Sequence, residues 1–234
     1  MRRGSLLAGA LALTVGFAAC GDDDNTPAAS STTSTTVGTD EPAATTTTAA
    51  EQPAPDISGS DLRASLEFHL QEHVYLAGLA TNEALAGRAE GFEAAAAALE
   101  RNSNDITLAI GIVYGEDAGA AFGPLWKKHI GFFVDYTTGI AADDQPKADQ
   151  AVADLTAYAD EFGAFLESAT EGGLTKDAVA TLVSEHATTL IAAIDAQKAG
   201  DTATAFGNLK DAAGHMTAIA DALAAAIAEQ QGLS

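Results

Sequence analysis

The sequence has little cysteine, little basic charge and few aromatic residues. The single cysteine, Cys20, excludes an internal disulfide framework. Eleven Lys and Arg stand against 33 Asp and Glu, a formal net charge of −22, so the chain would repel the phosphates of a nucleic acid. Aromatic residues make up 6%, and much of the 47% hydrophobic content is alanine. Because alanine favours helix over strand, the composition excludes a β-sandwich and predicts an all-α protein.

The longest apolar run lies at the N-terminus and predicts a secretory signal. Two arginines, Arg2 and Arg3, precede an apolar run over residues 6–19, and Cys20 follows. The run is shorter than the roughly 18 to 20 residues that span a bilayer, and its order of basic, apolar and small residues is typical of a signal peptide. Its end, Phe17-Ala18-Ala19-Cys20, resembles the lipobox of bacterial lipoproteins, with Phe17 in place of the usual leucine. The alternative is an ordinary signal peptide with an incidental cysteine.

The resemblance to lipoproteins implies that residues 1–19 are removed and that Cys20 carries lipid, including palmitate. Two acyl chains suffice for stable anchoring, so the expected location is the outer face of the cell membrane. Loss of Arg2 and Arg3 leaves nine basic and 33 acidic residues, a charge of −24. Such an acidic domain needs a spacer from anionic lipid. Residues 20–57 are rich in Thr, Ser, Ala and Pro, which predicts a disordered tether.

Residues 58–234 are predicted to form a helical bundle. From Asp61 onward, apolar residues recur at steps of three and four, as in Leu62, Leu66 and Leu70. Turn residues interrupt this pattern near residues 87–91, 115–119, 143–146, 172–173 and 200–201. The spacing predicts six helices of roughly 22 to 28 residues each. A six-helix bundle and a four-helix bundle with an added hairpin both fit this pattern.

An internal repeat relates three parts of this region. His73, His129 and His186 lie 56 and 57 residues apart, and 29 residues after them come Asn102, Tyr158 and His215. The repeating unit is helix, turn, helix, over residues 62–117, 118–173 and 174–230. A chance alignment of alanine-rich helices would not reproduce the rarer residues. Because one hairpin cannot bury its apolar stripe alone, we expect the three hairpins to pack as one bundle.

The histidines are the candidate functional residues. His73, His129, His186 and His215 each lie within the apolar stripe of a predicted helix. Neutral imidazole is the commonest metal ligand in proteins, and a histidine-rich site suits zinc or copper. Convergence of these four side chains would create a transition-metal site in the core. Accessory ligands or hydrogen-bond partners could come from His69, Tyr158 and Asn102.

Two other functions remain open, and catalysis has little support. The histidines could be core residues copied by duplication, in a structural or protein-interaction module. A haem or other small ligand could instead bind beside His129 and Tyr158. The sequence has no Glu-x-x-His pair, no His-Glu-x-x-His helix, no Gly-x-Ser-x-Gly elbow and no phosphate loop. The sequence therefore predicts a binding protein rather than an enzyme, and it identifies no protein partner.

A second resemblance covers most of residues 62–230. The segment Leu125-Trp126-Lys127-Lys128-His129-Ile130, with Tyr136, is similar to segments in an uncharacterised family of small secreted bacterial helical proteins. The stretch 102–115 resembles the same family. Its members repeat an apolar-x-x-His-apolar core along their helices. The resemblance implies an all-α fold and a repeated histidine, and it implies no activity.

Overall fold

The computed structural model describes residues 57–234, where the chain forms six helices and no strand. The helices are α1 (Gly59–Leu85), α2 (Ala89–Tyr114), α3 (Glu116–Ala141), α4 (Gln145–Ala169), α5 (Lys176–Ala199) and α6 (Thr202–Gln231). Five have 24 to 27 residues, as predicted, and α6 is longer at 30 residues. The predicted signal peptide, Cys20 and the tether up to residue 56 lie outside the described residues.

Side-chain caps explain where several helices begin. Ser58 and Asp61 form a capping box at the start of α1, in which each side chain bonds the other residue's backbone N–H. Asp144 caps α4, where Pro146 occupies the first turn, and Asp201 caps α6. These polar side chains satisfy backbone donors that have no partner inside the helix.

The predicted break at residues 115–119 is too long. Gly115 alone separates α2 from α3, with a φ of 93° that favours glycine. Gly119 instead lies inside α3 and faces Gly111 of α2, where a Cβ atom on Gly119 would lie 3.2 Å from the Gly111 Cα. This pair of glycines lets the two helices approach closely, so Gly119 serves packing rather than a turn.

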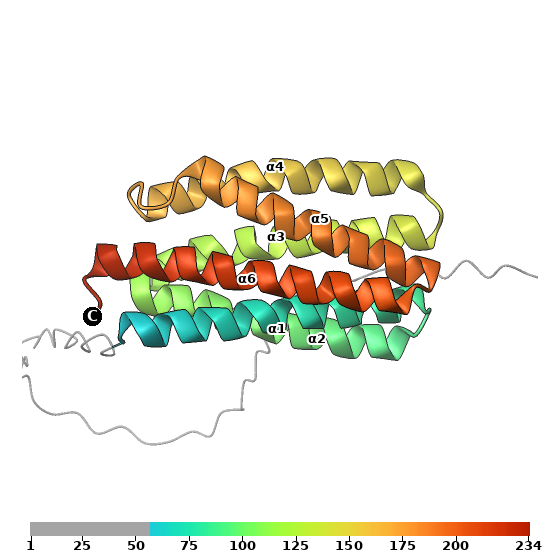
Figure 1. Cartoon of the computed structure of the whole chain (residues 1–234), viewed down its shortest axis with the longest axis horizontal. Coiled ribbons are helices and arrows are strands. Elements are labelled where there is room, and N and C mark those ends of the chain that lie inside the picture. Colours follow the sequence, from blue (N-terminus) through green and yellow to red (C-terminus); the bar gives the residue numbers. More distant parts are fainter. Residues whose placement is uncertain (1–56) are drawn as a thin grey trace, which may run out of the picture. The chain divides into compact units, whose positions relative to one another are not determined.

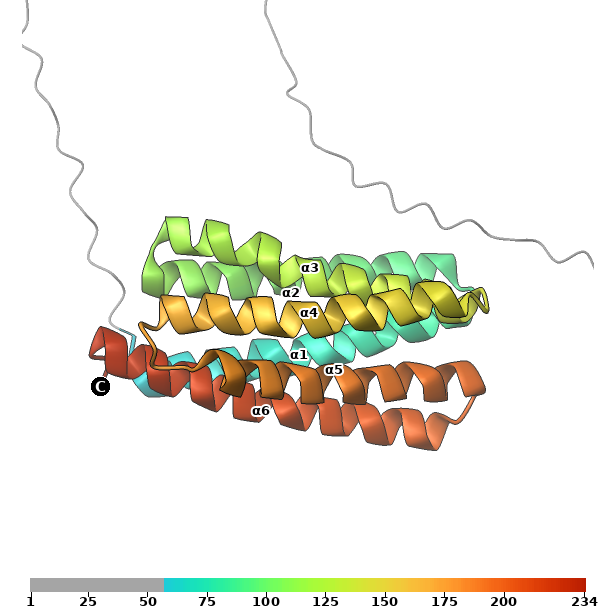
Figure 2. The ribbon, with the colours of Figure 1, turned by 90° about the horizontal axis from the view of Figure 1, so that it is seen from above.

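The helices form a closed ring of three antiparallel hairpins. Each helix packs against the next one in the chain, and α6 closes the ring against α1 (Figures 1 and 2). The turns of all three hairpins lie at the same end of the bundle in Figure 1, so α1, α3 and α5 run in the same direction. These three helices also contact one another and form an inner layer. Residues 57–234 therefore form a six-helix bundle, and the predicted hairpin repeat is confirmed.

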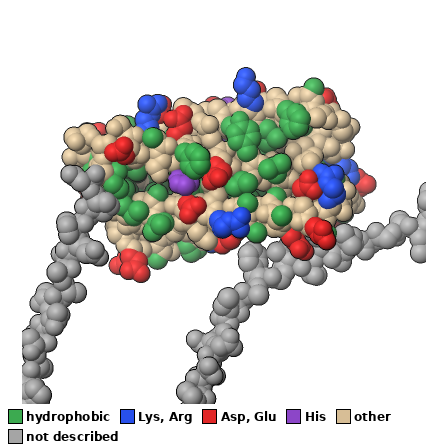
Figure 3. Space-filling view, turned by 90° about the horizontal axis from the view of Figure 1, so that it is seen from below, with side chains coloured by type: hydrophobic (Ala, Val, Ile, Leu, Met, Phe, Trp, Pro, Cys, Tyr) green, Lys and Arg blue, Asp and Glu red, His purple; other side chains and the backbone are tan. Residues whose placement is uncertain are grey.

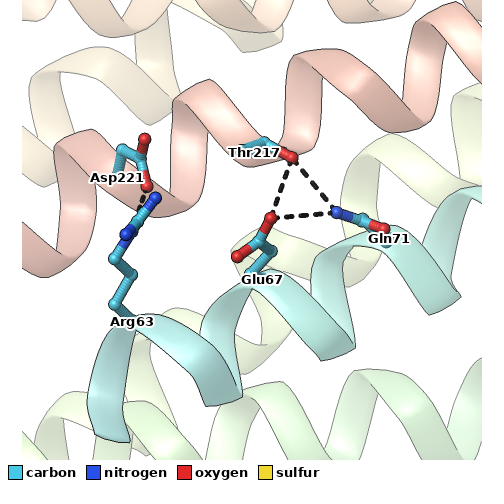
Figure 4. Close-up of polar contacts among 5 residues, drawn as sticks. All are labelled: Arg63, Glu67, Gln71, Thr217 and Asp221. Carbon is cyan, nitrogen blue, oxygen red and sulfur yellow. Dashed lines mark hydrogen bonds and ion pairs between the residues drawn. The ribbon is translucent and has the colours of Figure 1, made fainter. Parts of the chain in front are cut away.

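Within the described ring, α1 and α6 are the only neighbouring helices that no loop connects. We call the contact between them the seam. Arg63 pairs with Asp221 across this seam (Figure 4). Further along it, Gln71 donates a 3.1 Å hydrogen bond to Thr217, whose hydroxyl is 3.2 Å from the Glu67 carboxylate. Exposed ion pairs stabilise a protein only weakly. We infer that apolar packing holds the seam together and that these polar contacts fix its register.

The surface of the bundle is mixed in character. Figure 3 shows acidic, basic and apolar side chains interspersed on one face, with a histidine among them. Lys127 and Lys128 lie at the surface and pair with Glu100 and Glu161, whereas their neighbour Trp126 is buried. None of the helices between residues 57 and 234 combines the length and apolar character that a membrane span requires.

Truncating a core side chain should destabilise the bundle strongly. Leu190 of α5 is 1% exposed, and Leu108 of α2 is 63% exposed. We expect Leu190→Ala to lower the free energy of unfolding by about 2 to 5 kcal/mol, because it removes buried apolar contacts and leaves a cavity. The matched change Leu108→Ala should alter it by less than about 0.5 kcal/mol. Urea unfolding followed by circular dichroism measures both values, and equal losses would contradict the described core.

Candidate metal centre

The three inner helices bring three histidines to the centre of the bundle. His73 of α1, His129 of α3 and His186 of α5 are only 2%, 6% and 5% exposed. The Nε2 atoms of His73 and His129 face each other at 3.3 Å, and the two ring centroids are 5.3 Å apart. His186 lies near enough that a charge on it would lower the pKa of both His73 and His129. The parallel run of the inner helices places these repeat-equivalent residues at one level.

Each outer helix contributes the polar residue that lies 29 positions after the inner histidine of the same hairpin. The Asn102 side chain lies beside His73, and the Tyr158 ring centroid is 5.1 Å from that of His129. His215 lies near His186, because a charge on His215 would lower the pKa of His186. The repeat in sequence therefore becomes a repeat in space, with one inner histidine and one outer polar residue in each hairpin.

The predicted residues do not all converge on one point. Within residues 57–234, no three His, Cys, Asp or Glu side chains are arranged to hold a metal ion. His215 is partly exposed and lines surface grooves between α5 and α6. His69 is also partly exposed, and its contacts are with the Phe68 ring and with Glu72, whose carboxylate is 3.9 Å from His69 Nδ1. The centre that the structure forms is the facing pair of His73 and His129, which we call the histidine pair.

Burial keeps the central imidazoles neutral. Loss of hydration lowers the pKa of His73 well below its ordinary value, and the neighbouring His129 and His186 lower it further. Burial likewise lowers the pKa of His129 to about 3 and that of His186 to about 4. A neutral imidazole offers a free lone pair to a metal ion. The histidine pair is therefore competent to bind a metal at neutral pH without first losing a proton.

Asn102 supports His73 from the outer side. Its amide nitrogen donates 2.9 Å hydrogen bonds to the His69 carbonyl and to the Glu72 carboxylate. The amide oxygen is left free, and the Asn102 side chain raises the pKa of His73 by attracting its proton. Metal-binding histidines commonly have such an acceptor behind the ring, where it orients the ligand. The sequence allowed Asn102 to be either an accessory ligand or a hydrogen-bond partner. Its position fits the role of hydrogen-bond partner.

Aromatic rings enclose the histidine pair. The Trp126 ring lies 4.9 Å from the His73 ring and 4.7 Å from the His129 ring, measured between centroids. Tyr158 stacks on Phe162 at 5.4 Å, and burial raises its pKa, so it remains a neutral phenol. Because these rings contact one another directly, haem could enter beside His129 and Tyr158 only if they moved apart. In the sequence, the position of Trp126 three residues before His129 is the signal that places it beside the pair.

Several buried polar atoms around the pair lack a hydrogen-bond partner. They are Nδ1 of His73, His129 and His186, Nε1 of Trp126, the Tyr158 hydroxyl and Oδ1 of Asn102. Buried polar groups are nearly always satisfied, so these exceptions mark the surroundings of the histidine pair as an unusually polar part of the core. Two facing neutral imidazoles can share only one proton between their Nε2 atoms. A cation at this point would let both Nε2 atoms act as acceptors and leave both Nδ1 atoms as donors.

No protein-family model matches the chain, and no curated protein or solved structure is found to match it. The geometry and chemistry of the histidine pair are therefore the basis for inferring a function.

The buried imidazoles predict a loss of stability in mild acid. Below pH 6.5 the unfolded chain takes up protons that the folded histidines do not, so the free energy of unfolding falls as the pH is lowered. The loss is at most about 1.4 kcal/mol per pH unit for each histidine. Its onset between pH 6.5 and about 5 precedes the titration of most carboxylates. Urea unfolding of metal-free protein across this range measures the slope.

Two variants provide the control for this pH dependence. His129→Gln removes one buried titrating group and should flatten the slope between pH 6.5 and 5. Lys127→Gln, a surface change two residues away, should leave it unaltered. An identical slope in the wild-type chain and in His129→Gln would contradict the burial of a neutral His129 in the folded state.

Proposed function

We propose that this chain is a membrane-anchored extracytoplasmic lipoprotein whose helical domain binds a transition-metal ion without catalysing a reaction. The observation that carries the metal-binding proposal is the 3.3 Å separation of the His73 and His129 Nε2 atoms. Two nitrogens bound to one tetrahedral ion at about 2.0 to 2.1 Å lie about 3.3 Å apart. The spacing of the histidine pair therefore matches one edge of a metal coordination sphere. His186 is the nearest further candidate ligand.

Two properties of the surroundings support this function. The lowered pKa of both histidines keeps them free of a competing proton in mild acid, where ordinary histidines become protonated. The acceptors beside the rings are the Asn102 side chain for His73 and the Trp126 backbone for His129. Both could take a proton from Nδ1 while Nε2 holds the ion, although neither makes a complete hydrogen bond in the metal-free arrangement.

The same contact also supports a second function. A separation of 3.3 Å is compatible with a direct hydrogen bond between the two rings. In that case the histidines are structural, and the bundle is a protein-interaction module that folds fully without metal. The two functions differ in whether the pair binds an ion that stabilises the fold.

Metal titration of matched variants distinguishes the two functions. The starting protein is the chain from residue 20 with Cys20→Ser, which removes a competing thiol. Copper and zinc ions are titrated separately, and for the ion that binds we expect one ion per chain by calorimetry. When the free metal is at 100 times its dissociation constant, binding should raise the free energy of unfolding by about 2.7 kcal/mol, and the thermal midpoint should rise accordingly. His73→Gln and His129→Gln should weaken binding at least 100-fold, a loss of about 2.7 kcal/mol. His69→Gln, outside the pair on the same helix, should bind as tightly as the starting protein.

Two results would contradict metal binding at this pair. One is the absence of binding by the starting protein while its helices and thermal unfolding are intact. The other is undiminished binding in a folded double variant, His73→Gln with His129→Gln. Either result would favour the structural function of the histidines.

The anchoring part of the proposal rests on residues 1–57. Full-length chain expressed in a bacterium should sediment with membranes and incorporate labelled palmitate, because a lipidated Cys20 carries enough acyl chain for stable anchoring. Cys20→Ser should lose both properties. The conservative change Ser30→Ala in the predicted tether serves as control. Equal membrane association of Cys20→Ser and wild type would disprove lipidation as the means of anchoring.

A further inference from the structure

The histidine pair has a charge environment that bears on which ion it can hold. The rings in contact with the pair belong to the uncharged Trp126, Tyr158 and Phe133. Glu72 reaches Asn102 and the edge of His69, and Glu161 pairs with Lys128 at the surface. Within the described residues, no carboxylate or thiolate contributes to a cluster that could hold a metal. An ion at the pair would therefore keep its full charge.

A full charge in a dry core is expensive, and the cost rises with its square. Moving an ion from water into a medium of low dielectric constant costs a divalent ion about four times as much as a monovalent ion of equal size. Zinc sites offset this cost with anionic ligands, a bound hydroxide or several imidazoles and water. The enclosed pair offers none of the anionic groups, so it discriminates against divalent ions.

The number of available ligands leads to the same conclusion. Zinc takes four ligands in a structural site, and three plus water in a catalytic site. The structure supplies two nitrogens near ligand spacing, and no three His, Cys, Asp or Glu side chains of the described residues are arranged around an ion. Closed-shell monovalent copper is stable with two nitrogen ligands in a near-linear arrangement, or with three, and demands no fourth. A linear arrangement separates the two Nε2 atoms beyond their present 3.3 Å, so the two rings would move apart slightly when the ion enters. Imidazole is also a suitable ligand for copper.

Trp126 adds an attraction for a cation at this point. Its ring lies within 5 Å of both imidazole centroids, so a cation held by the pair would lie close to the indole. Tryptophan attracts a cation that lies over the face of its ring, within about 6 Å of the centroid, more strongly than the other aromatic residues do. In a site that excludes water, this attraction partly replaces the hydration that the ion loses.

We propose that the ion held by His73 and His129 is monovalent copper, stabilised by Trp126. This inference rests on the proposed function, since it specifies the ion that the same pair takes. Silver(I) has the same charge and closed shell, is stable to air and therefore serves as a second probe. No electron transfer is involved, because the ion is bound and released in one oxidation state.

The experiment compares monovalent with divalent ions on the chain from residue 20 with Cys20→Ser. Copper(I) is titrated without oxygen against the chelator bicinchoninate, silver(I) and zinc(II) are titrated separately, and Trp126, the only tryptophan, reports binding by fluorescence. We expect copper(I) to bind at least 1,000-fold more tightly than zinc(II), with silver(I) also bound. X-ray absorption should show two or three nitrogen neighbours. Binding of either monovalent ion should quench the Trp126 fluorescence.

Variants separate the role of each residue. His129→Gln should lose copper(I) and silver(I) binding, whereas Trp126→Phe should retain both nitrogens and bind about 10-fold more weakly. His215→Gln, beside His186 and outside the pair, serves as the folded control. An unaltered copper(I) affinity in Trp126→Phe would show that the indole does not stabilise the bound ion.

The possible failures are distinguishable. Zinc(II) or copper(II) bound through His73 and His129 as tightly as copper(I) would overturn the monovalent assignment and leave the proposed function intact. A sulfur neighbour in the absorption spectrum would place the ion away from the histidine pair and overturn both. No binding of any of these ions by a folded chain would also overturn both.

Discussion

The arrangement depends on the burial of polar imidazoles where the three inner helices meet. A charged imidazolium that loses its hydration is costly in an apolar core, and this cost keeps His73, His129 and His186 neutral. The surrounding leucines and aromatic rings supply the packing that holds the rings there. Within that enclosure, the Nε2 atoms of His73 and His129 face each other at 3.3 Å.

The threefold repeat has consequences beyond fold stability. Duplication gave each hairpin the same inner histidine, but the outer positions have diverged to Asn102, Tyr158 and His215. Asn102 lies beside His73, Tyr158 lies beside His129, and His215 lies at the partly exposed rim near His186. The centre is therefore asymmetric, and the rings of His73 and His129 face each other more closely than either faces that of His186 in the contacts that the structure shows.

Much of the fold could be predicted from the sequence, because periodicity and turn residues are local properties. The six helices, the hairpin repeat and the burial of His73, His129 and His186 are examples. The meeting of the Nε2 atoms could not be predicted, since it depends on helix order and side-chain rotamers. Gly119 was taken for a turn because sequence alone does not distinguish a glycine that breaks a helix from one that lets two helices touch. The predictions for residues 1–56 concern a segment that the structure does not describe, so they rest on motif alone.

The most direct test of the central claim is to locate the ion itself. Crystals of the chain from residue 20 with Cys20→Ser, grown with copper(I) in the absence of oxygen, would reveal the metal by anomalous scattering at the copper edge. Copper(I) binding at the histidine pair predicts one strong peak between the Nε2 atoms of His73 and His129, beside the Trp126 ring. The six helices should pack in the order described above. A strong peak only in the surface grooves beside His215, or no peak in a folded molecule, would contradict it.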